Sequence, residues 1–473
     1  MNYKSILFFL GIYLLVVSLF SIINILYSVY FDFIIDLNSY IVTLLISFFI
    51  GVSFCYLGKA HSKNILLTEQ IISITLSFII LPLIISIPYY LSVYNITLLD
   101  AYFESVSGFT STGFSILENI KNIDYPLKLW RSSSQWIGGL VFLISVIGTI
   151  GSRQIKIKPA YLITGGASGR NFYNNFYNNF IKIFLIYFFS TIIIIFIYTS
   201  VDIRLFDAFN LSFTIISAGG FIPTNNLSNI ITNDLQTFIL SLTLLIPILN
   251  FFLIFDLITK KFTTKSFSED SHLILLIVIL TLFIYFFVIP YEGFAYVFLA
   301  IVSSISTSGI TTHSSSFDLS LFLIILSIIG GSLISTSSGL KYTRFYILLK
   351  ISYQEIYRLV KPINIVDKNL YNTENKIDDD VFKIAFFVFI TFILGIFILS
   401  SILTLNDLDF ENAFKLSILT LTNTVNSSLY GLENLNFFDF NIPTKMSLII
   451  FMILGKIEII TVIYLTKRFI FKE

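Results

Sequence analysis

The chain has 473 residues, of which 56% are hydrophobic and 12% charged, with a formal net charge of +1. This composition is typical of a polytopic membrane protein in contact with lipid; it excludes a soluble enzyme, and nothing in it predicts a nucleic-acid partner. One cysteine and three scattered histidines exclude a disulfide framework and a Cys/His metal cluster.

Apolar runs of roughly 20 residues, the length that a bilayer core requires, predict ten membrane spans. The first is too long and continuous for a signal peptide, and no small-residue cleavage site follows it. The predicted spans lie near residues 5–29, 39–58, 70–94, 128–150, 178–200, 235–258, 271–290, 319–347, 381–403 and 444–466.

Four shorter, half-apolar segments separate later spans and are predicted to be re-entrant, because each is too short to cross a bilayer. Each begins near an acidic residue, continues as an amphipathic helix and ends in small polar residues. They lie at 100–114, 207–221, 292–310 and 411–426. The recurrence predicts four span–loop–span repeats behind an N-terminal helix pair. The expected boundaries are 1–65 for the helix pair and 66–155, 176–260, 268–350 and 380–473 for the repeats.

Most of the 29 Lys and Arg residues fall on one side of these spans, which the positive-inside rule makes the cytoplasmic side, with both termini there. The re-entrant segments then enter from outside. Because their flanks hold most of the acidic residues, we expect an acidic outer vestibule that concentrates cations.

The ends of the re-entrant segments predict a site for a monovalent cation. Four short helices aiming their carboxyl ends at one axis would each present roughly −0.5 elementary charge. Neutral carbonyl and hydroxyl oxygens would replace the water shell of the ion, whereas a divalent cation would require nearby carboxylates. We expect Gly113, Gly220 and Gly309 to supply the positive φ angles that this geometry needs.

The chain resembles the TrkH/KtrB/HKT superfamily of potassium transporters, and most closely its TrkH branch, over almost its full length. The resemblance rests on the segments GluSerValSerGlyPheThrSerThrGly (104–113), TrpArgSerSerSerGlnTrpIleGlyGlyLeu (130–140), SerAlaGlyGlyPhe (217–221), GlyGlySerLeuIleSerThrSerSerGlyLeuLys (330–341) and LeuGlyLysIleGlu (454–458).

This resemblance implies an all-α membrane protein with four repeats around a pseudo-fourfold pore, channel-like K⁺ uptake across the bacterial inner membrane, and gating from the cytoplasmic side. It also implies a homodimer in membrane lipid above a cytoplasmic, nucleotide-binding regulatory ring of the TrkA type. K⁺ is the transported ion, and no organic cofactor is expected. The implied filter residues are Thr110, Ser111, Thr112, Gly113, Ser217, Ala218, Gly219, Gly220, Ser306, Thr307, Ser308, Gly309, Asn423, Thr424, Val425 and Asn426.

Two departures from the family pattern concern the third and fourth segments. The fourth has no glycine at its end; repeat spacing places Val425 at the filter position, whereas motif matching places Asn426 there. This departure favours the alternative of Na⁺-permeable or Na⁺-coupled transport. In the third, the acid lies 17 residues before Gly309, which predicts a longer or offset helix.

A Gly/Ser run at 330–339 within the eighth span cannot hold a firm helix, and it either unwinds or makes a close helix contact. The resemblance implies a gate here, with Lys456, where the family usually has Arg, facing the cavity below the filter. We expect Lys456 to lie too deep to reach the interface, and Glu458 not to be its partner. The implied gate residues are Gly331, Ser335, Thr336, Ser338, Gly339, Lys341 and Lys456.

An intramembrane enzyme is the alternative from another class. Such enzymes need paired acids or a His/Asp set at the membrane face, whereas the acids here, Asp100, Asp207, Glu292 and Glu411, occur one per repeat. No nucleotide-binding loop accompanies them. The sequence therefore predicts a transporter.

Overall fold

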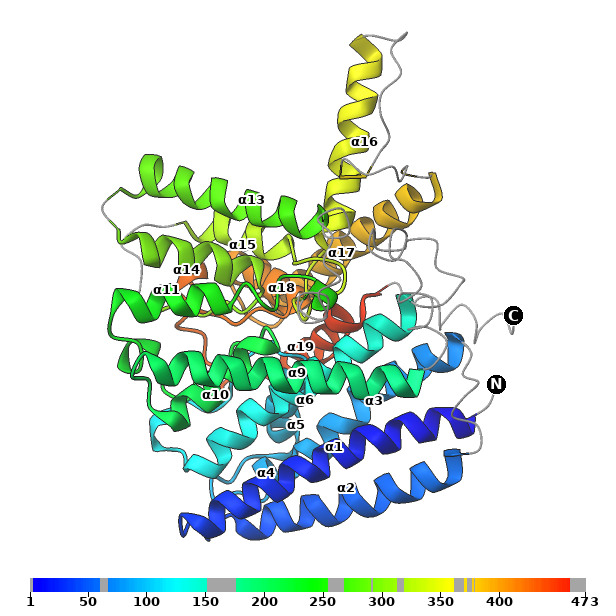
Figure 1. Ribbon diagram of the computed structural model, residues 1–473, viewed down its shortest axis with the longest axis vertical. Helices are drawn as coiled ribbons and strands as arrows, with labels where there is room; N and C mark the ends of the chain where they lie inside the picture. The colour runs from blue at the N-terminus through cyan, green and yellow to red at the C-terminus, as the bar shows by residue number, and fades with distance from the viewer. Residues whose placement is uncertain are drawn as a thin grey trace.

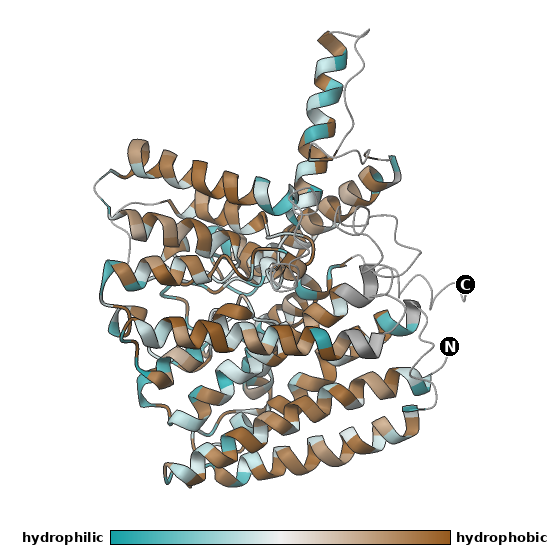
Figure 2. Ribbon diagram, viewed as in Figure 1, coloured by the Kyte–Doolittle hydropathy of each residue, from teal (hydrophilic) through white to brown (hydrophobic). Residues whose placement is uncertain are grey.

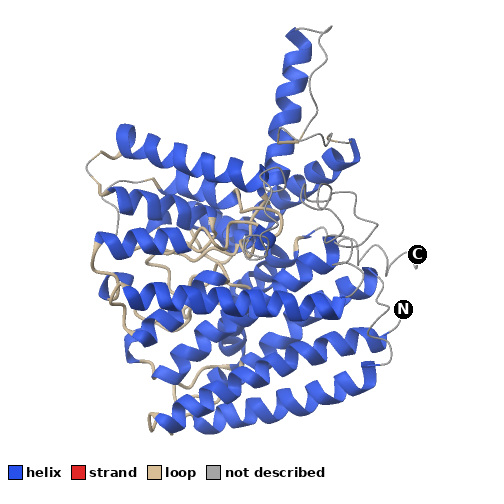
Figure 3. Ribbon diagram, in the orientation of Figure 1, coloured by secondary structure: helices blue, strands red, loops and turns tan. Residues whose placement is uncertain are grey.

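The computed structural model describes residues 3–59, 67–150, 176–253, 268–290, 292–312, 319–360, 370–371, 377 and 379–459. Within these residues the secondary structure is helical, apart from one isolated bridge between Ile329 and Leu340 (Figure 3). The longer helices are α1 (Tyr3–Tyr30), α2 (Leu37–Gly58), α3 (Leu67–Ile85), α6 (Tyr125–Ile150), α9 (Phe176–Ser200), α11 (Asp234–Thr243), α13 (Ser268–Phe283), α16 (Tyr342–Val360), α17 (Asp379–Leu405) and α19 (Ile442–Ile457).

Six helical segments in the described part are long and apolar enough to cross a membrane, and Figure 2 shows the ribbons of the long helices mostly in brown, the colour of hydrophobic residues. They are Tyr3–Tyr30, Leu37–Gly58, Glu69–Tyr90, Phe180–Ser200, Ser268–Val288 and Val381–Leu405. Their outward side chains are apolar, as contact with lipid tails requires. The chain is therefore a multi-pass, all-α membrane protein.

Helices α1 and α2 lie side by side at one edge of the molecule, where Figure 1 shows them in blue. Glycines allow their backbones to approach closely: a Cβ at Gly11 would lie 2.8 Å from the Cys55 backbone nitrogen, and one at Gly58 would lie 2.4 Å from the Lys4 carbonyl oxygen. Small residues at such contacts are how membrane helices pack. The predicted N-terminal helix pair is present.

The sixth predicted span, 235–258, does not continue as one helix. Helix α11 ends at Thr243, and irregular turns follow. Pro247 has no N–H with which to continue a helix, and the Ile248 carbonyl accepts a hydrogen bond from the distant Ser332 backbone N–H at 2.8 Å. The predicted ends of the sixth and tenth spans, at 258 and 466, lie outside the described residues.

The eighth predicted span is broken, as its Gly/Ser run indicated. Helix α15 (Ser320–Ile328) stops, residues 329–341 form an irregular intramembrane loop, and α16 begins at Tyr342. The loop closes on itself, because Gly330 N donates to the Leu340 carbonyl at 2.8 Å. Helix α16 then projects from the body of the molecule (Figure 1, yellow).

The four predicted re-entrant segments are short helices: α5 (Leu98–Phe109), α10 (Leu205–Ile216), α14 (Phe294–Ile305) and α18 (Phe410–Thr422). The expectation that the third would be longer or offset is wrong. Gly309 lies 15 residues after the start of α14, as Gly113 does after the start of α5. The acid is displaced instead: Glu292 precedes the helix, whereas Asp100 lies within its first turn.

Candidate functional site

The four short helices end in the same local structure. In each, a backbone N–H two or three residues past the helix end donates to the carbonyl five residues earlier, a contact typical of the Schellman motif. The four bonds are Thr112 N to Ser107 O (2.9 Å), Gly219 N to Thr214 O (2.8 Å), Ser308 N to Ser303 O (3.1 Å) and Thr424 N to Leu419 O (2.9 Å). We call residues 110–113, 217–220, 306–309 and 423–426 the tip segments.

The left-handed position of this motif is not at the glycines that the sequence analysis chose. It is at Ser111, Ala218, Thr307 and Asn423, whose φ angles are 61°, 55°, 60° and 50°. Two residues later, Gly113 and Gly309 also have positive φ, but Gly220 does not. Positive φ therefore explains two of the three glycines, and Gly220 needs another reason.

Close approach supplies that reason. A Cβ at Gly220 would lie 2.4 Å from Cβ of Val425, and one at Gly113 would lie 2.8 Å from Cα of Gly220. A Cβ at Gly309 would lie 2.9 Å from Cγ1 of Val425. The ends of the four tip segments therefore meet, and the isopropyl group of Val425 contacts the positions of all three glycines. Repeat spacing, rather than motif matching, gives the correct equivalent residue.

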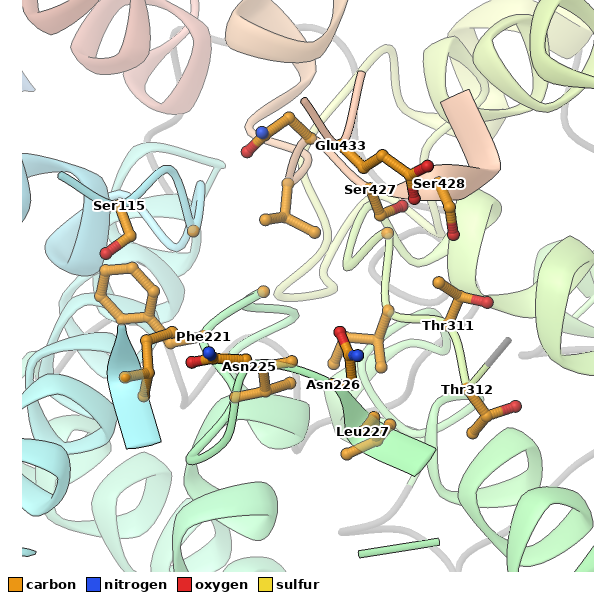
Figure 4. Close-up of a pocket in the computed structure, with 18 of the residues that line it drawn as sticks. Ser115, Phe221, Asn225, Asn226, Leu227, Thr311, Thr312, Ser427, Ser428 and Glu433 are labelled. Atoms are coloured by element: carbon orange, nitrogen blue, oxygen red, sulfur yellow. The ribbon is translucent and has the colours of Figure 1, made fainter. Parts of the chain in front are cut away.

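An open cavity of about 600 Å³ lies above this meeting point. Figure 4 shows residues from four separate segments around it, among them Ser115, Asn226, Thr311 and Ser428. Its described lining includes two charged side chains, Arg131 and Glu433, beside many neutral polar groups. The expectation of an acidic vestibule is therefore wrong for the described lining of this cavity.

The acids at the starts of the short helices have basic partners instead. Asp100 binds Lys445 at 2.6 Å, Asp207 binds Arg204 at 3.0 Å and Glu411 binds Lys415 at 2.7 Å. The pair of Asp100 and Lys445 is buried and joins the first short helix to α19, 345 residues away. Asp100 thus joins two helices, whereas Asp207 and Glu411 pair within their own short-helix segments, and none of the three carboxylates is among the described residues that line the cavity.

The tip segments carry buried oxygen atoms suited to a cation. Hydroxyl groups two residues apart are within hydrogen-bond distance in or next to three of them: Thr110 and Thr112 (2.7 Å), Ser306 and Ser308 (3.0 Å), and Thr424 with Thr422, the last residue of α18 (2.9 Å). Ser111 Oγ and Asn423 Oδ1 are buried and have no hydrogen-bond partner within the described residues. A buried oxygen without a donor is stabilised by a positive charge.

Hydrogen bonds and burial hold the remaining predicted filter residues in place. Asn423 Nδ2 donates to Thr112 Oγ1 at 3.0 Å and thereby links the fourth tip to the first. Asn426 donates to the Leu432 carbonyl at 3.2 Å and lines the cavity beside Val425. Ser217, Ala218 and Thr307 are buried as well.

The intramembrane loop lies directly against two of the tips. Thr336 Oγ1 donates to the carbonyl of Ile216, at the end of α10, at 2.9 Å. The backbone N–H of Ser338 donates to Thr307 Oγ1 at 3.0 Å. The predicted gate residues therefore contact the predicted filter residues directly, on the side of the tips away from the cavity.

Two buried lysines hold the loop. Lys341 Nζ donates to the Ser337 carbonyl at 2.6 Å, and Lys456 Nζ donates to Ser338 Oγ at 3.0 Å. Both ammonium groups face the ring of Phe142, at 5.4 and 4.6 Å from its centre. Glu458, which was not expected to be the partner of Lys456, pairs with Arg344 at 2.7 Å.

Buried charged groups that the sequence pattern did not single out support the tips and the intramembrane loop. Glu104 and Arg131, both buried, bind each other at 2.9 Å, and Glu269 accepts a hydrogen bond from the Leu333 N–H of the intramembrane loop at 3.1 Å. A charged residue within a predicted span was a usable signal for Arg131. Their pairing across elements could not be read from spacing.

Comparison with known proteins gives consistent matches. Residues 318–470 match the TrkH family model, described as "Cation transport protein". An uncharacterized cation transporter of Methanocaldococcus jannaschii is 28% identical over 99% of this chain and 96% of its own length. The potassium uptake protein TrkG of Escherichia coli is 26% identical, covering 92% of each chain. The crystal structure of the potassium transporter TrkH from Vibrio parahaemolyticus aligns with a TM-score of 0.83 at 23% identity, covering 98% of each chain.

Proposed function

Because the chain belongs to the TrkH family of cation transport proteins, we propose that it carries K⁺ across the membrane through the region where its four tip segments meet. One observation carries the proposal: four helix ends with the same hydrogen-bonded turn meet at Gly113, Gly220, Gly309 and Val425. Their carboxyl ends direct partial negative charge toward one point without an ionised side chain.

The donor set fits a monovalent ion. Backbone carbonyls and the hydroxyls of the tip segments are neutral oxygens, and K⁺ is coordinated by such oxygens when it sheds its water. The described lining of the cavity above is mostly neutral and polar, with one basic side chain, Arg131, and one acidic side chain, Glu433. A hydrated ion would enter this cavity and lose water at the tips.

The direction and control of transport complete the proposal. The excess of Lys and Arg on one side supports an orientation in the cytoplasmic membrane with both termini in the cytoplasm and the cavity outside. The intramembrane loop, residues 329–341, closes the path below the tips and acts as the gate. We further propose that two copies pair in the membrane and that a cytoplasmic nucleotide-binding ring regulates the gate.

The test is cation flux in liposomes that contain the purified protein. Rb⁺ should enter K⁺-loaded vesicles faster than it enters protein-free vesicles, external K⁺ should compete with it, and Na⁺ should not. Flux equal to that of empty vesicles would overturn the proposal. Complementation of a bacterial strain that lacks potassium uptake, on limiting K⁺, is the matching test in cells.

Na⁺ permeation is the second candidate, and Val425 is the observation that favours it. The Val425 side chain lies at the tip that has no glycine, where it narrows the opening between the tips and makes the four tips unequal. A close-fitting set of carbonyl oxygens for K⁺ is therefore incomplete. If Na⁺ competes with Rb⁺ as well as K⁺ does in the same vesicles, this second candidate replaces the first.

A further inference from the structure

Helix α6 presents a polar face toward the tip segments. Arg131 and Gln135 are four residues apart and therefore project from the same side of the helix. Both are buried, with 2% and 0% of their surface exposed. A guanidinium and an amide at this depth are stable only when their hydrogen-bonding groups are matched by partners.

The partners of Arg131 lie on both sides of the first tip, Glu104 in α5 and Ser115 on the segment that leaves the tip. Its Nε donates to Glu104 Oε1 at 2.9 Å, and its Nη2 donates to Ser115 Oγ at 3.0 Å. Glu104 also accepts from the Ile116 backbone N–H at 2.9 Å. Ser115 and Ile116 follow Gly113 by two and three residues. The ion pair thus fixes the chain just beyond the first tip.

The same two side chains of α6 hold the second tip. The Arg131 guanidinium lies over the ring of Phe221, 4.1 Å from its centre. With the Gln135 amide oriented so that its nitrogen donates to Thr214, its oxygen accepts from Gly220 N at 3.2 Å and Phe221 N at 3.1 Å. Figure 4 places Ser115 and Phe221 at the same edge of the cavity.

We propose that Arg131 and Gln135 are positioning residues that set the separation of the first and second tip segments, and that they thereby determine which monovalent cation is preferred. The inference rests on the proposed function, because it treats the tips as the place where the ion sits. The planar guanidinium matters here: it donates in two directions while one face stacks on a ring. A lysine cannot do all three.

The test uses Arg131→Lys in the full-length protein, with Arg204→Lys as the matched control. Arg204 also binds a carboxylate, Asp207, but its side chain is 60% exposed and lies near the rings of Tyr125 and Phe206, outside the tips. We expect Arg131→Lys to lower the preference for K⁺ over Na⁺ by about tenfold, since it removes a buried charge-assisted contact, and Arg204→Lys to leave it unchanged.

The readout does not depend on transport. An ion that binds the folded protein raises its unfolding temperature, so half-maximal stabilisation by KCl and NaCl, with choline chloride as the reference salt, measures the preference. The chain has two tryptophans, Trp130 and Trp136, both buried next to these residues. Unchanged tryptophan emission shows that α6 still packs as in the wild type.

The outcomes distinguish this inference from the transport proposal. If Arg131→Lys keeps wild-type emission and the wild-type order of cations, the inference is wrong while the transport proposal stands. If another monovalent cation stabilises the wild type best and Arg131→Lys changes that order, the inference holds and the potassium proposal fails. Stabilisation by no monovalent cation overturns both. Should Arg131→Lys not fold, Gln135→Met, which keeps the volume and removes both acceptor bonds, must show the same loss of preference.

Discussion

Each of the four tips has a residue with a side chain at its left-handed position, where glycine is usual. Ser111, Ala218, Thr307 and Asn423 adopt positive φ at a cost of about 1–2 kcal/mol each relative to glycine. Asparagine tolerates this region better than the others. Two of these side chains make hydrogen bonds that glycine could not make. Thr307 accepts a hydrogen bond from the intramembrane loop, and Asn423 donates one that links the fourth tip to the first.

Val425 is the residue at which the fourfold pattern fails, and its side chain is testable. Val425→Gly removes the isopropyl group that contacts Gly113, Gly220 and Gly309, so the opening widens. We expect Rb⁺ flux to rise about tenfold, equivalent to a barrier lower by about 1.4 kcal/mol, and K⁺ preference over Na⁺ to increase. Flux into liposomes measures both.

Asn426→Gly is the matched control for Val425→Gly. The Asn426 side chain bonds the Leu432 carbonyl, and a change there leaves the opening between the glycines as it is. An increased preference in Asn426→Gly with none in Val425→Gly would show that Asn426, and not Val425, stands at the filter position.

At the scale of elements, the intramembrane loop interrupts a helix, and close packing and hydrogen bonds stabilise the interruption. Gly330 and Gly331 cannot be replaced easily, because a Cβ would lie 2.0 Å from the Ser338 carbonyl oxygen or 2.4 Å from that of Ile248. The break leaves the backbone N–H groups of Ser332 and Leu333 without helical partners. They donate instead to the Ile248 carbonyl and to Glu269 of α13. Irregular backbone at membrane depth needs such partners.

Lys456 links this loop to α19, and its charge lies below the tips. In Lys456→Gln the ammonium group is gone, so the loop loses the bond to Ser338 and cations no longer approach a fixed positive charge. We expect flux to rise about tenfold, with a barrier lower by about 1.4 kcal/mol. Lys456→Arg keeps the charge and should transport like the wild type. Equal or slower flux in a folded Lys456→Gln protein would argue for a purely structural lysine.

Sequence periodicity predicted the elements well because long apolar runs and short polar-ended helices have few alternative structures in a membrane. It failed where a break depends on a distant partner. The end of α11 at Thr243 is one case, since Ile248 is engaged by Ser332. The pairing of Asp100 with Lys445 is another, since it removes an expected charge from the cavity. Contacts across hundreds of residues leave no local pattern.

For the whole molecule, the loop between α1 and α2 meets the segments before α5 and α6 at a small acidic cluster. Asp36, between α1 and α2, accepts from the Val93 N–H at 3.3 Å. Asp124, just before α6, accepts from the Tyr94 hydroxyl at 3.3 Å. Burial, followed by the charge of Asp36, raises the pKa of Asp124 from 3.8 to about 6. The helix pair is therefore attached through Asp36, beside a second carboxyl, Asp124, whose ionisation is opposed by burial and by the charge of Asp36.

The raised pKa of Asp124 makes the stability of the folded protein depend on pH in a defined direction. Between pH 3.8 and about 6 the folded state holds a proton on Asp124 that the unfolded state has lost, so stability falls as pH rises through this range. The loss is about 1–3 kcal/mol, allowing for the partial exposure of the group. Asp124→Asn cannot ionise and should lack this part of the decline. Unfolding temperatures in detergent from acid to neutral pH measure it, with Asp202→Asn, at an exposed carboxyl, as the control. A decline of the same size in Asp124→Asn would remove Asp124 as its cause and leave Asp36, the other buried carboxyl of the cluster, as the group to replace next.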